Sequence, residues 1–430
     1  MRDVTNDSED MRYMDNKQPP RAPSKRVTRV TAAILTVAFL GFVFAALAGT
    51  LANNGHDVLN SLRMTPTVRA TLPEHPDRLD RLAARINSFT SKISEVMWMK
   101  DELGYVNSDF QYALGKRMIN TGSQNMIRLN TGHLYDLVPY KSLVEGSEGI
   151  ADLVQTTLKD IPALFVYEHP TLYDASMMPA EYAALDHSAE MADEVVSTLR
   201  ARGVRVLDSR DVLPKSGYPL DDLLWVTDQH WSTLSAITMA RAIAGELNGM
   251  TGAELEPDRI DPDTMEQYVH EKFFLGKYGQ RVGTRRVTPD DIIEYWPRYD
   301  TNITRETKRS STVTEHASGP FRETCIRRTY LEPDPGKTWS KLAYTYYGQV
   351  EYYSVFENPD APDFTILLLK DSYSAPIGTF LSLLARHVIF VDMRQDVDPL
   401  PVWLEKYQPD AVVIAYSLQM MRDDNYEFAN

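Results

Sequence analysis

Residues 364–369 read Phe-Thr-Ile-Leu-Leu-Leu, the most apolar run outside the N-terminal region, and the polar residues Lys-Asp-Ser-Tyr-Ser follow at 370–374. A short continuous apolar run of this kind is typical of a strand that is buried on both faces of a sheet. A helical pattern at 377–385 comes directly after the polar turn. A strand that leads through a tight turn into a helix is the repeating unit of parallel sheets.

The same alternation of apolar runs and helical patterns continues through much of the chain. Further strands are predicted at 163–167 and 411–416, with weaker candidates at 204–207 and 388–391, and helices at 187–202 and 234–247. The pattern predicts an α/β fold with a mostly parallel central sheet that helices cover on both faces. Ligands of such folds bind where the carboxyl ends of the strands meet. Residues 250–345 lack clear periodicity, so we expect a large insertion there, packed beside the sheet.

The N-terminal region predicts a membrane anchor. Residues 30–51 are uncharged and mainly apolar, and as a helix they would span about 33 Å, enough to cross the ~30 Å core of a bilayer. Basic residues dominate from Lys17 to Arg29, and basic flanks stay in the cytoplasm. A cleaved signal peptide is the alternative, because Ala46-Leu47-Ala48 fits a cleavage site.

These segments give a domain prediction for the whole chain. We expect a disordered cytoplasmic tail at 1–29, a transmembrane signal-anchor helix at 30–51, a stalk at 52–100 and an extracellular domain at 101–430. The protein is thus predicted to be a single-pass protein of the cell membrane.

Composition excludes several classes of protein. The chain has 430 residues and a formal net charge of −15, and an acidic chain is a poor ligand for nucleic acid, which needs a basic surface. Cys325 is the only cysteine, so an intramolecular disulfide and a zinc site built on cysteines are both excluded.

Two predicted turns carry residue types that suit acyl transfer. Asp228 and His230 are two positions apart, so on an extended segment their side chains point to one side. Ser372 follows a buried strand and precedes a helix, where a hydroxyl is presented outward and the helix N-terminus favours a developing oxyanion. We interpret Ser372 as a candidate nucleophile, His230 as its base and Asp228 as the group that orients the base.

Other interpretations of these residues stay open at this level. An Asp-x-His pair is also typical of a cap beside a core histidine, and a serine after a strand is often a turn residue. Asp228 and His230, with His270 or Asp371 as a third ligand, would instead hold a metal ion. A metal-dependent hydrolase is therefore a rival hypothesis.

Several motifs, in the same order, resemble the DHHW family of bacterial exported proteins, which is related to the SGNH-hydrolase-like alginate O-acetyltransferases. The resemblance rests on Asp228-Gln-His-Trp231 and Lys370-Asp-Ser-Tyr-Ser374, and on the stretches 129–134, 207–210, 271–281 and 390–394. The family has His at the second signature position, where this chain has Gln229. Because Asp228 and His230 are both present, this replacement of His by Gln229 affects a substrate contact or a structural hydrogen bond and not the catalytic residues.

The resemblance implies an SGNH-like three-layer α/β/α domain. It further implies a Ser–His–Asp mechanism that transfers or hydrolyses an acyl group, expected to be O-acetyl, on a carbohydrate of the cell envelope such as an exopolysaccharide. Ser372, His230 and Asp228 carry over as the catalytic residues, and no cofactor or metal is expected.

Five further residues are candidates for an oxyanion or substrate contact: Asn130, Gly132, Trp231, Arg281 and Arg394. Each also has an ordinary structural interpretation. Asn130 and Gly132 suit a β-turn, Trp231 suits packing under a helix, and the two arginines suit an ion pair or a solvated loop.

The expected partners follow from the same resemblance. They are a cell-surface carbohydrate, the lipid bilayer through 30–51, and a multi-span membrane O-acyltransferase that supplies the acyl group, because one helix does not carry acyl groups across a membrane. The alternative function is a non-catalytic glycan-binding or assembly protein on the same fold. In that case the aromatic residues of the insertion and its exit, such as Trp296, Tyr299 and Tyr344, would form a sugar platform.

Overall fold

The computed structural model describes residues 25–61, 78–97, 99–120, 124–168, 172, 175–348, 350–395 and 397–422. The chain divides into two compact units, Met1–Leu103 and Gly104–Asn430. Most of the predicted tail, residues 1–24, lies outside the described residues.

The first unit contains helices α1 (Lys25–Asn60) and α3 (Arg78–Val96) and the start of α4 (Lys100–Ala113). Within α1, Thr36–His56 has a mean hydropathy of 1.8, and by length and composition it is able to cross a membrane. It is the one such helix in the described part of the chain, and a signal sequence would meet the same criteria. The predicted anchor thus lies within a helix that is longer than expected.

The second unit is built on an eight-stranded sheet in the order β5-β4-β13-β11-β12-β10-β8-β9. Its first five strands run parallel to one another: β5 (Arg205–Asp208), β4 (Ala163–Glu168), β13 (Ala411–Ser417), β11 (Thr365–Lys370) and β12 (His387–Val391). All five coincide with strands that the sequence predicts. The fold is therefore α/β with a sheet that is mainly parallel.

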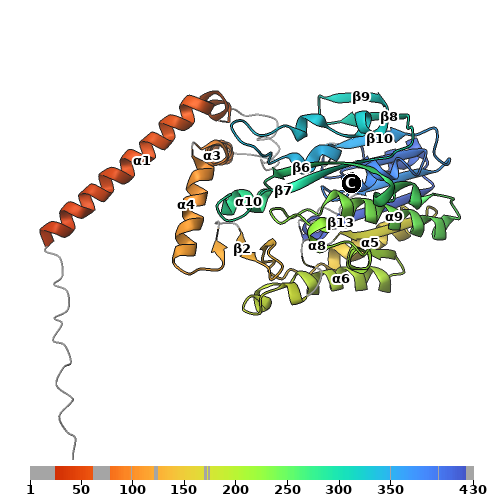
Figure 1. Cartoon of the computed structure of the whole chain (residues 1–430), viewed down its shortest axis with the longest axis horizontal. Coiled ribbons are helices and arrows are strands. Elements are labelled where there is room, and N and C mark those ends of the chain that lie inside the picture. The colour runs from red at the N-terminus through yellow and green to blue at the C-terminus, as the bar shows by residue number, and fades with distance from the viewer. Residues whose placement is uncertain are drawn as a thin grey trace, which may run out of the picture. The chain divides into compact units, whose positions relative to one another are not determined.

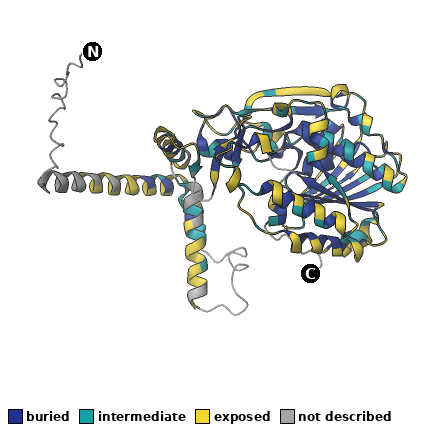
Figure 2. Ribbon diagram, turned by 90° about the horizontal axis from the view of Figure 1, so that it is seen from below, coloured by how far each residue is buried: buried dark blue, intermediate teal, exposed yellow. Residues whose placement is uncertain are grey.

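Helices cover both faces of this sheet, as Figures 1 and 2 show. On one face Leu164 and Leu368 pack with α9 (Thr233–Thr251) and α12 (Ala375–Leu381). On the other, Phe165 and Leu369 pack with α5 (Val144–Gln155), α6 (Ser188–Ala201) and α13 (Leu400–Tyr407). Alternate residues of one strand thus enter different apolar layers. The predicted three-layer α/β/α arrangement is confirmed.

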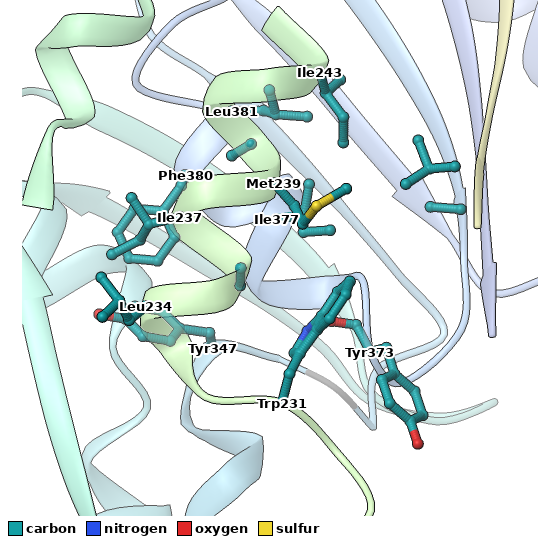
Figure 3. Packing of buried hydrophobic residues seen from close by; sticks show 14 of the residues in the cluster. Trp231, Leu234, Ile237, Met239, Ile243, Tyr347, Tyr373, Ile377, Phe380 and Leu381 are labelled. Atoms are coloured by element: carbon teal, nitrogen blue, oxygen red, sulfur yellow. The ribbon is translucent and has the colours of Figure 1, made fainter. Parts of the chain in front are cut away.

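Helices α9 and α12 pack directly against each other. Ile237 and Met239 of α9 lie beside Ile377 and Phe380 of α12 (Figure 3). Because α12 begins three residues after Ser372, this packing fixes the turn that carries the serine.

The region 250–345 differs from the expectation of an insertion lying beside the sheet. Strands β8 (Ile303–Lys308) and β9 (Thr314–Gly319) extend the sheet in antiparallel fashion, through β10 (Tyr353–Glu357). Arg305 and Thr307 occupy buried positions of β8, so the alternation of apolar and polar residues that would reveal a strand is missing from the sequence.

Shorter elements complete the unit. The rest of the insertion forms a hairpin of β6 (Glu266–Phe274) and β7 (Asp290–Trp296), with α10 (Lys277–Val282) between them. A small sheet joins β1 (Ile119–Asn120), β2 (Asn125–Arg128) and β3 (Leu134–Asp136). The short helices are α7 (Ser209–Val212), α8 (Leu220–Leu223), α11 (Phe321–Cys325) and α14 (Leu418–Arg422).

Candidate active site

Ser372 lies in the turn between β11 and α12, at the carboxyl edge of the sheet. The preceding Asp371 accepts hydrogen bonds from the Tyr373 backbone N–H (2.8 Å) and from the Ser417 N–H (2.9 Å) and hydroxyl (2.6 Å). The Ser374 hydroxyl accepts from the Asp371 N–H and donates to the Ala415 carbonyl, 3.1 Å in each case. The turn is thus tied to the end of β13 on both sides of Ser372, which itself stays half-buried.

Asp228, His230 and Ser372 form a continuous chain of hydrogen bonds. His230 Nε2 lies 2.9 Å from Ser372 Oγ, and His230 Nδ1 lies 2.6 Å from Asp228 Oδ1. Asp228 and His230 are 2% and 6% exposed, so water competes little for these bonds. The structure therefore brings together the three residues that the sequence singled out, although they are 142 positions apart at the serine–histidine contact.

The Asp228 carboxylate is held by further donors. It accepts the His230 backbone N–H on Oδ1 (3.0 Å) and the Lys277 backbone N–H on Oδ2 (2.7 Å). Burial would raise the pKa of Asp228, but the charge of His230 and these hydrogen bonds outweigh it and lower the pKa below its usual value. Asp228 is therefore an anion at neutral pH, suited to orient the imidazole and to stabilise its protonated form.

Two neighbouring segments hold Asp228 in place. A Cβ on Gly276 would lie 2.3 Å from Asp228 Cβ, so only glycine permits this close approach. Asp290 of β7 accepts the backbone N–H groups of Val226 (2.7 Å) and Thr227 (2.9 Å), and its burial raises its pKa to about 6. The stretch 271–281, noted above only as a family resemblance, thus lies against the segment that carries the acid.

Two tyrosine rings enclose the His230 imidazole. The Tyr344 ring stacks on it with centroids 4.6 Å apart and planes at 20°, and the Tyr373 centroid lies 4.5 Å away. The two rings thus restrict rotation of the imidazole. The sequence analysis considered Tyr344 only as part of a sugar platform. Its neighbours Tyr346 and Tyr347, aromatic residues of the same region, are fully buried in the core.

A cavity of about 480 Å³ opens beside this chain of residues. Gln229 and Tyr373, the sequence neighbours of His230 and Ser372, both line it, and Lys277, Arg281 and Arg422 supply cationic groups against the single carboxylate of Asp136. Its walls are thus polar and mainly basic, although the chain as a whole is acidic. Of the five further candidates, Arg281 lies at this cavity.

Asn130 and Gly132 lie elsewhere. The Asn130 amide donates to the carbonyls of Ser176 (2.9 Å) and Met178 (3.3 Å), and Gly132 has a φ of +92° in the adjoining turn. Asn130 lines a different cavity, which contains none of the residues around Ser372. The structure does not bring these two residues to the serine, and the β-turn interpretation fits their geometry.

Trp231 and Arg394 also make structural contacts. The Trp231 indole N–H donates to the Tyr373 carbonyl (3.0 Å) and its ring packs beneath α9, only 2% exposed (Figure 3). Arg394 binds both carboxylate oxygens of Asp392, at 2.8 and 2.6 Å. Trp231 thus supports the serine turn from below, whereas Arg394 forms an ion pair and is not among the residues that line the cavity.

The residues considered for a metal site have other partners. His270 pairs with Glu294 (2.7 Å), and both ring nitrogens of His230 are engaged by Asp228 and Ser372. Asp371 binds the serine turn. Among the described residues, no group of three His, Cys, Asp or Glu side chains is arranged to hold a metal ion.

Comparisons with known proteins agree with this fold. Residues 165–318 match the family model described as SGNH hydrolase-like domain, acetyltransferase AlgX. A DHHW family protein from Eubacterium siraeum superposes with a TM-score of 0.55 at 15% identity, covering 73% of this chain and 96% of its own. PatB1 of Bacillus cereus, in a structure with a sulfonyl adduct, gives 0.58 at 16% identity, covering 72% and 100%.

No curated protein matches the sequence. The resemblance to SGNH-hydrolase-like proteins of the DHHW and alginate O-acetyltransferase type is confirmed, and the α/β domain is SGNH-like.

Proposed function

We propose that this chain is a membrane-anchored enzyme that transfers or hydrolyses an acyl group, expected to be O-acetyl, on a cell-surface carbohydrate. The observation that carries the proposal is the hydrogen-bonded chain from Asp228 through His230 to Ser372. The match to an acetyltransferase family model supports the reaction class.

The proposed reaction has two halves. Ser372 Oγ attacks the carbonyl carbon of an ester while its proton passes to His230 Nε2, giving a tetrahedral oxyanion. Collapse breaks the bond to the leaving alcohol, which takes the proton from His230, and leaves an acyl ester on Ser372. A sugar hydroxyl or water then gives its proton to His230, attacks the acyl carbon and restores the free serine. The nature of this second nucleophile decides between transferase and esterase.

The cavity beside Gln229 is the proposed site for the carbohydrate. Its polar lining offers donors and acceptors for sugar hydroxyls, and Lys277, Arg281 and Arg422 would attract acidic substituents. Gln229 stands where the family has His, so its amide would contact the substrate without titrating.

The apolar helix Thr36–His56 supports an anchored location with the SGNH-like unit outside the cell. Acyl groups would then come from a membrane O-acyltransferase partner.

An assay on the full chain in detergent tests the proposal. The protein is expected to release p-nitrophenol from p-nitrophenyl acetate, and to pass acetyl to an oligosaccharide acceptor, detected as an acetylated product by mass spectrometry. Ester loss at the buffer rate, with no acetylated product from neutral or acidic oligosaccharides, would refute it and leave the glycan-binding alternative.

A further inference from the structure

Glu168, the last residue of β4, is a carboxyl group that the proposed reaction does not use. It is 0% exposed, and neither of its oxygens has a hydrogen-bond partner among the described residues. Its register partner on β13 is Ser417, the residue that donates two hydrogen bonds to Asp371. A buried carboxyl without a partner is costly, so its state needs an explanation.

The two hydroxyl groups near Glu168 donate their hydrogen bonds to other acceptors. The Ser374 hydroxyl gives its proton to the Ala415 carbonyl, and the Ser417 hydroxyl gives its proton to Asp371. The Asp371 carboxylate faces Glu168 and accepts three hydrogen bonds in all, one fewer than the roughly four sites that a carboxylate offers. Two carboxylates are acceptors only, so they bond to each other only if one carries a proton.

The surroundings of the two carboxyl groups decide whether Glu168 or Asp371 carries the proton. Asp371 accepts hydrogen bonds from three donors, whereas neither oxygen of Glu168 has a hydrogen-bond partner among the described residues. Burial, followed by the negative charge of Asp371, raises the pKa of Glu168 well above its usual value, although the nearby Ser374 hydroxyl and the cation of Lys370 act in the opposite direction. Three further groups act on this site. The Arg394 cation interacts electrostatically with Asp371, and Tyr373 of the turn and Tyr416 of β13 are buried phenols that stay neutral.

We propose that Glu168 is a positioning residue that remains a neutral acid, donates a hydrogen bond to Asp371 and thereby fixes the turn that presents Ser372. The proposal rests on the proposed function, because the turn matters through the serine. On ionisation, two adjacent buried carboxylates would repel and push Asp371 away from the Tyr373 N–H, so the serine would lose its alignment with His230.

Two variants separate this role from simple packing. In Glu168→Gln the amide still donates to Asp371 but does not titrate, so kcat is expected to stay within a few-fold of the parent. In Glu168→Ala the donor is gone, and kcat should fall by about 10- to 100-fold, the cost of a small displacement, with little change in KM. Equal kcat for the two variants would overturn the proposal.

A stability measurement provides a readout that does not depend on activity. The unfolded carboxyl titrates near 4.3, and the folded pKa is raised, so above that pH the unfolded chain releases a proton that the folded chain keeps. Stability of the parent must therefore fall relative to Glu168→Gln as pH rises from 5 to 8. If the difference in Tm between the parent and Glu168→Gln stays constant from pH 5 to 8, Glu168 is not a neutral acid in the folded protein. If that difference changes with pH but the parent shows no ester turnover, only the proposed function is refuted.

Discussion

Replacing Ser372 with Ala is expected to abolish acyl transfer, with kcat reduced by about 10⁴-fold or more. The hydroxyl is the atom that would form the acyl bond, and it lies 2.9 Å from His230 Nε2. Folding should be preserved, because in the described part of the chain Asp371 and Ser374, not Ser372, make the side-chain hydrogen bonds that tie the turn to β13. The measurement is the initial rate of acetyl release together with Tm.

The matched control is Ser318→Ala, on the exposed edge strand β9, which should retain the parent rate. If Ser372→Ala hydrolyses the ester as fast as the control, Ser372 is not the nucleophile and the reaction must use another group.

Replacing Asp228 with Asn is the second large effect that we expect. The carboxylate accepts a hydrogen bond from the Nδ1–H of His230, which leaves Nε2 unprotonated and able to take the proton of Ser372. An amide whose NH₂ faces Nδ1 favours the opposite tautomer, with the proton on Nε2, and the base is lost. A fall in kcat of about 10⁴-fold follows.

This variant also carries a pH signature. The pKa of Asp228 is lowered in the folded protein, so its contribution to stability is present above the unfolded value near 3.9 and is lost as pH falls through the folded pKa. Asp228→Asn should remove that contribution, and its Tm should depend less on pH below 5. The exposed Asp160→Asn serves as control; similar kcat values for the two variants would contradict the assigned role.

The parallel part of the fold was predictable from sequence because its central strands are continuously apolar. Residues 366–369 are buried by helices on both faces, and such strands need no alternation to be recognised. Strands β8 to β10 were not predicted. Their buried positions include polar residues such as Thr307 and Ser354, whose hydroxyls bond to each other across the strands, so burial leaves no periodic signal in the sequence.

The candidate active site was also predictable only in part. Ser372 and His230 each follow local patterns that place polar groups at turns, and motif order linked them. Nothing local distinguishes Asn130 from a binding residue, since its contacts with Ser176 and Met178 appear only on folding. For Arg394 the carboxylate partner, Asp392, is only two residues away, so the ion-pair interpretation was open from the sequence. Gly276 and Glu168 were missed for the same reason: each acts on a segment far away in sequence.

The covalent step is the central claim, and mass spectrometry of the full chain tests it most directly. The protein would be quenched in acid during turnover of an acetyl ester and digested. The account predicts an acetyl group on the peptide that contains Ser372, which disappears when acceptor sugar is added before the quench. Product formation with no acetylated peptide, or with acetyl on another residue, would contradict it.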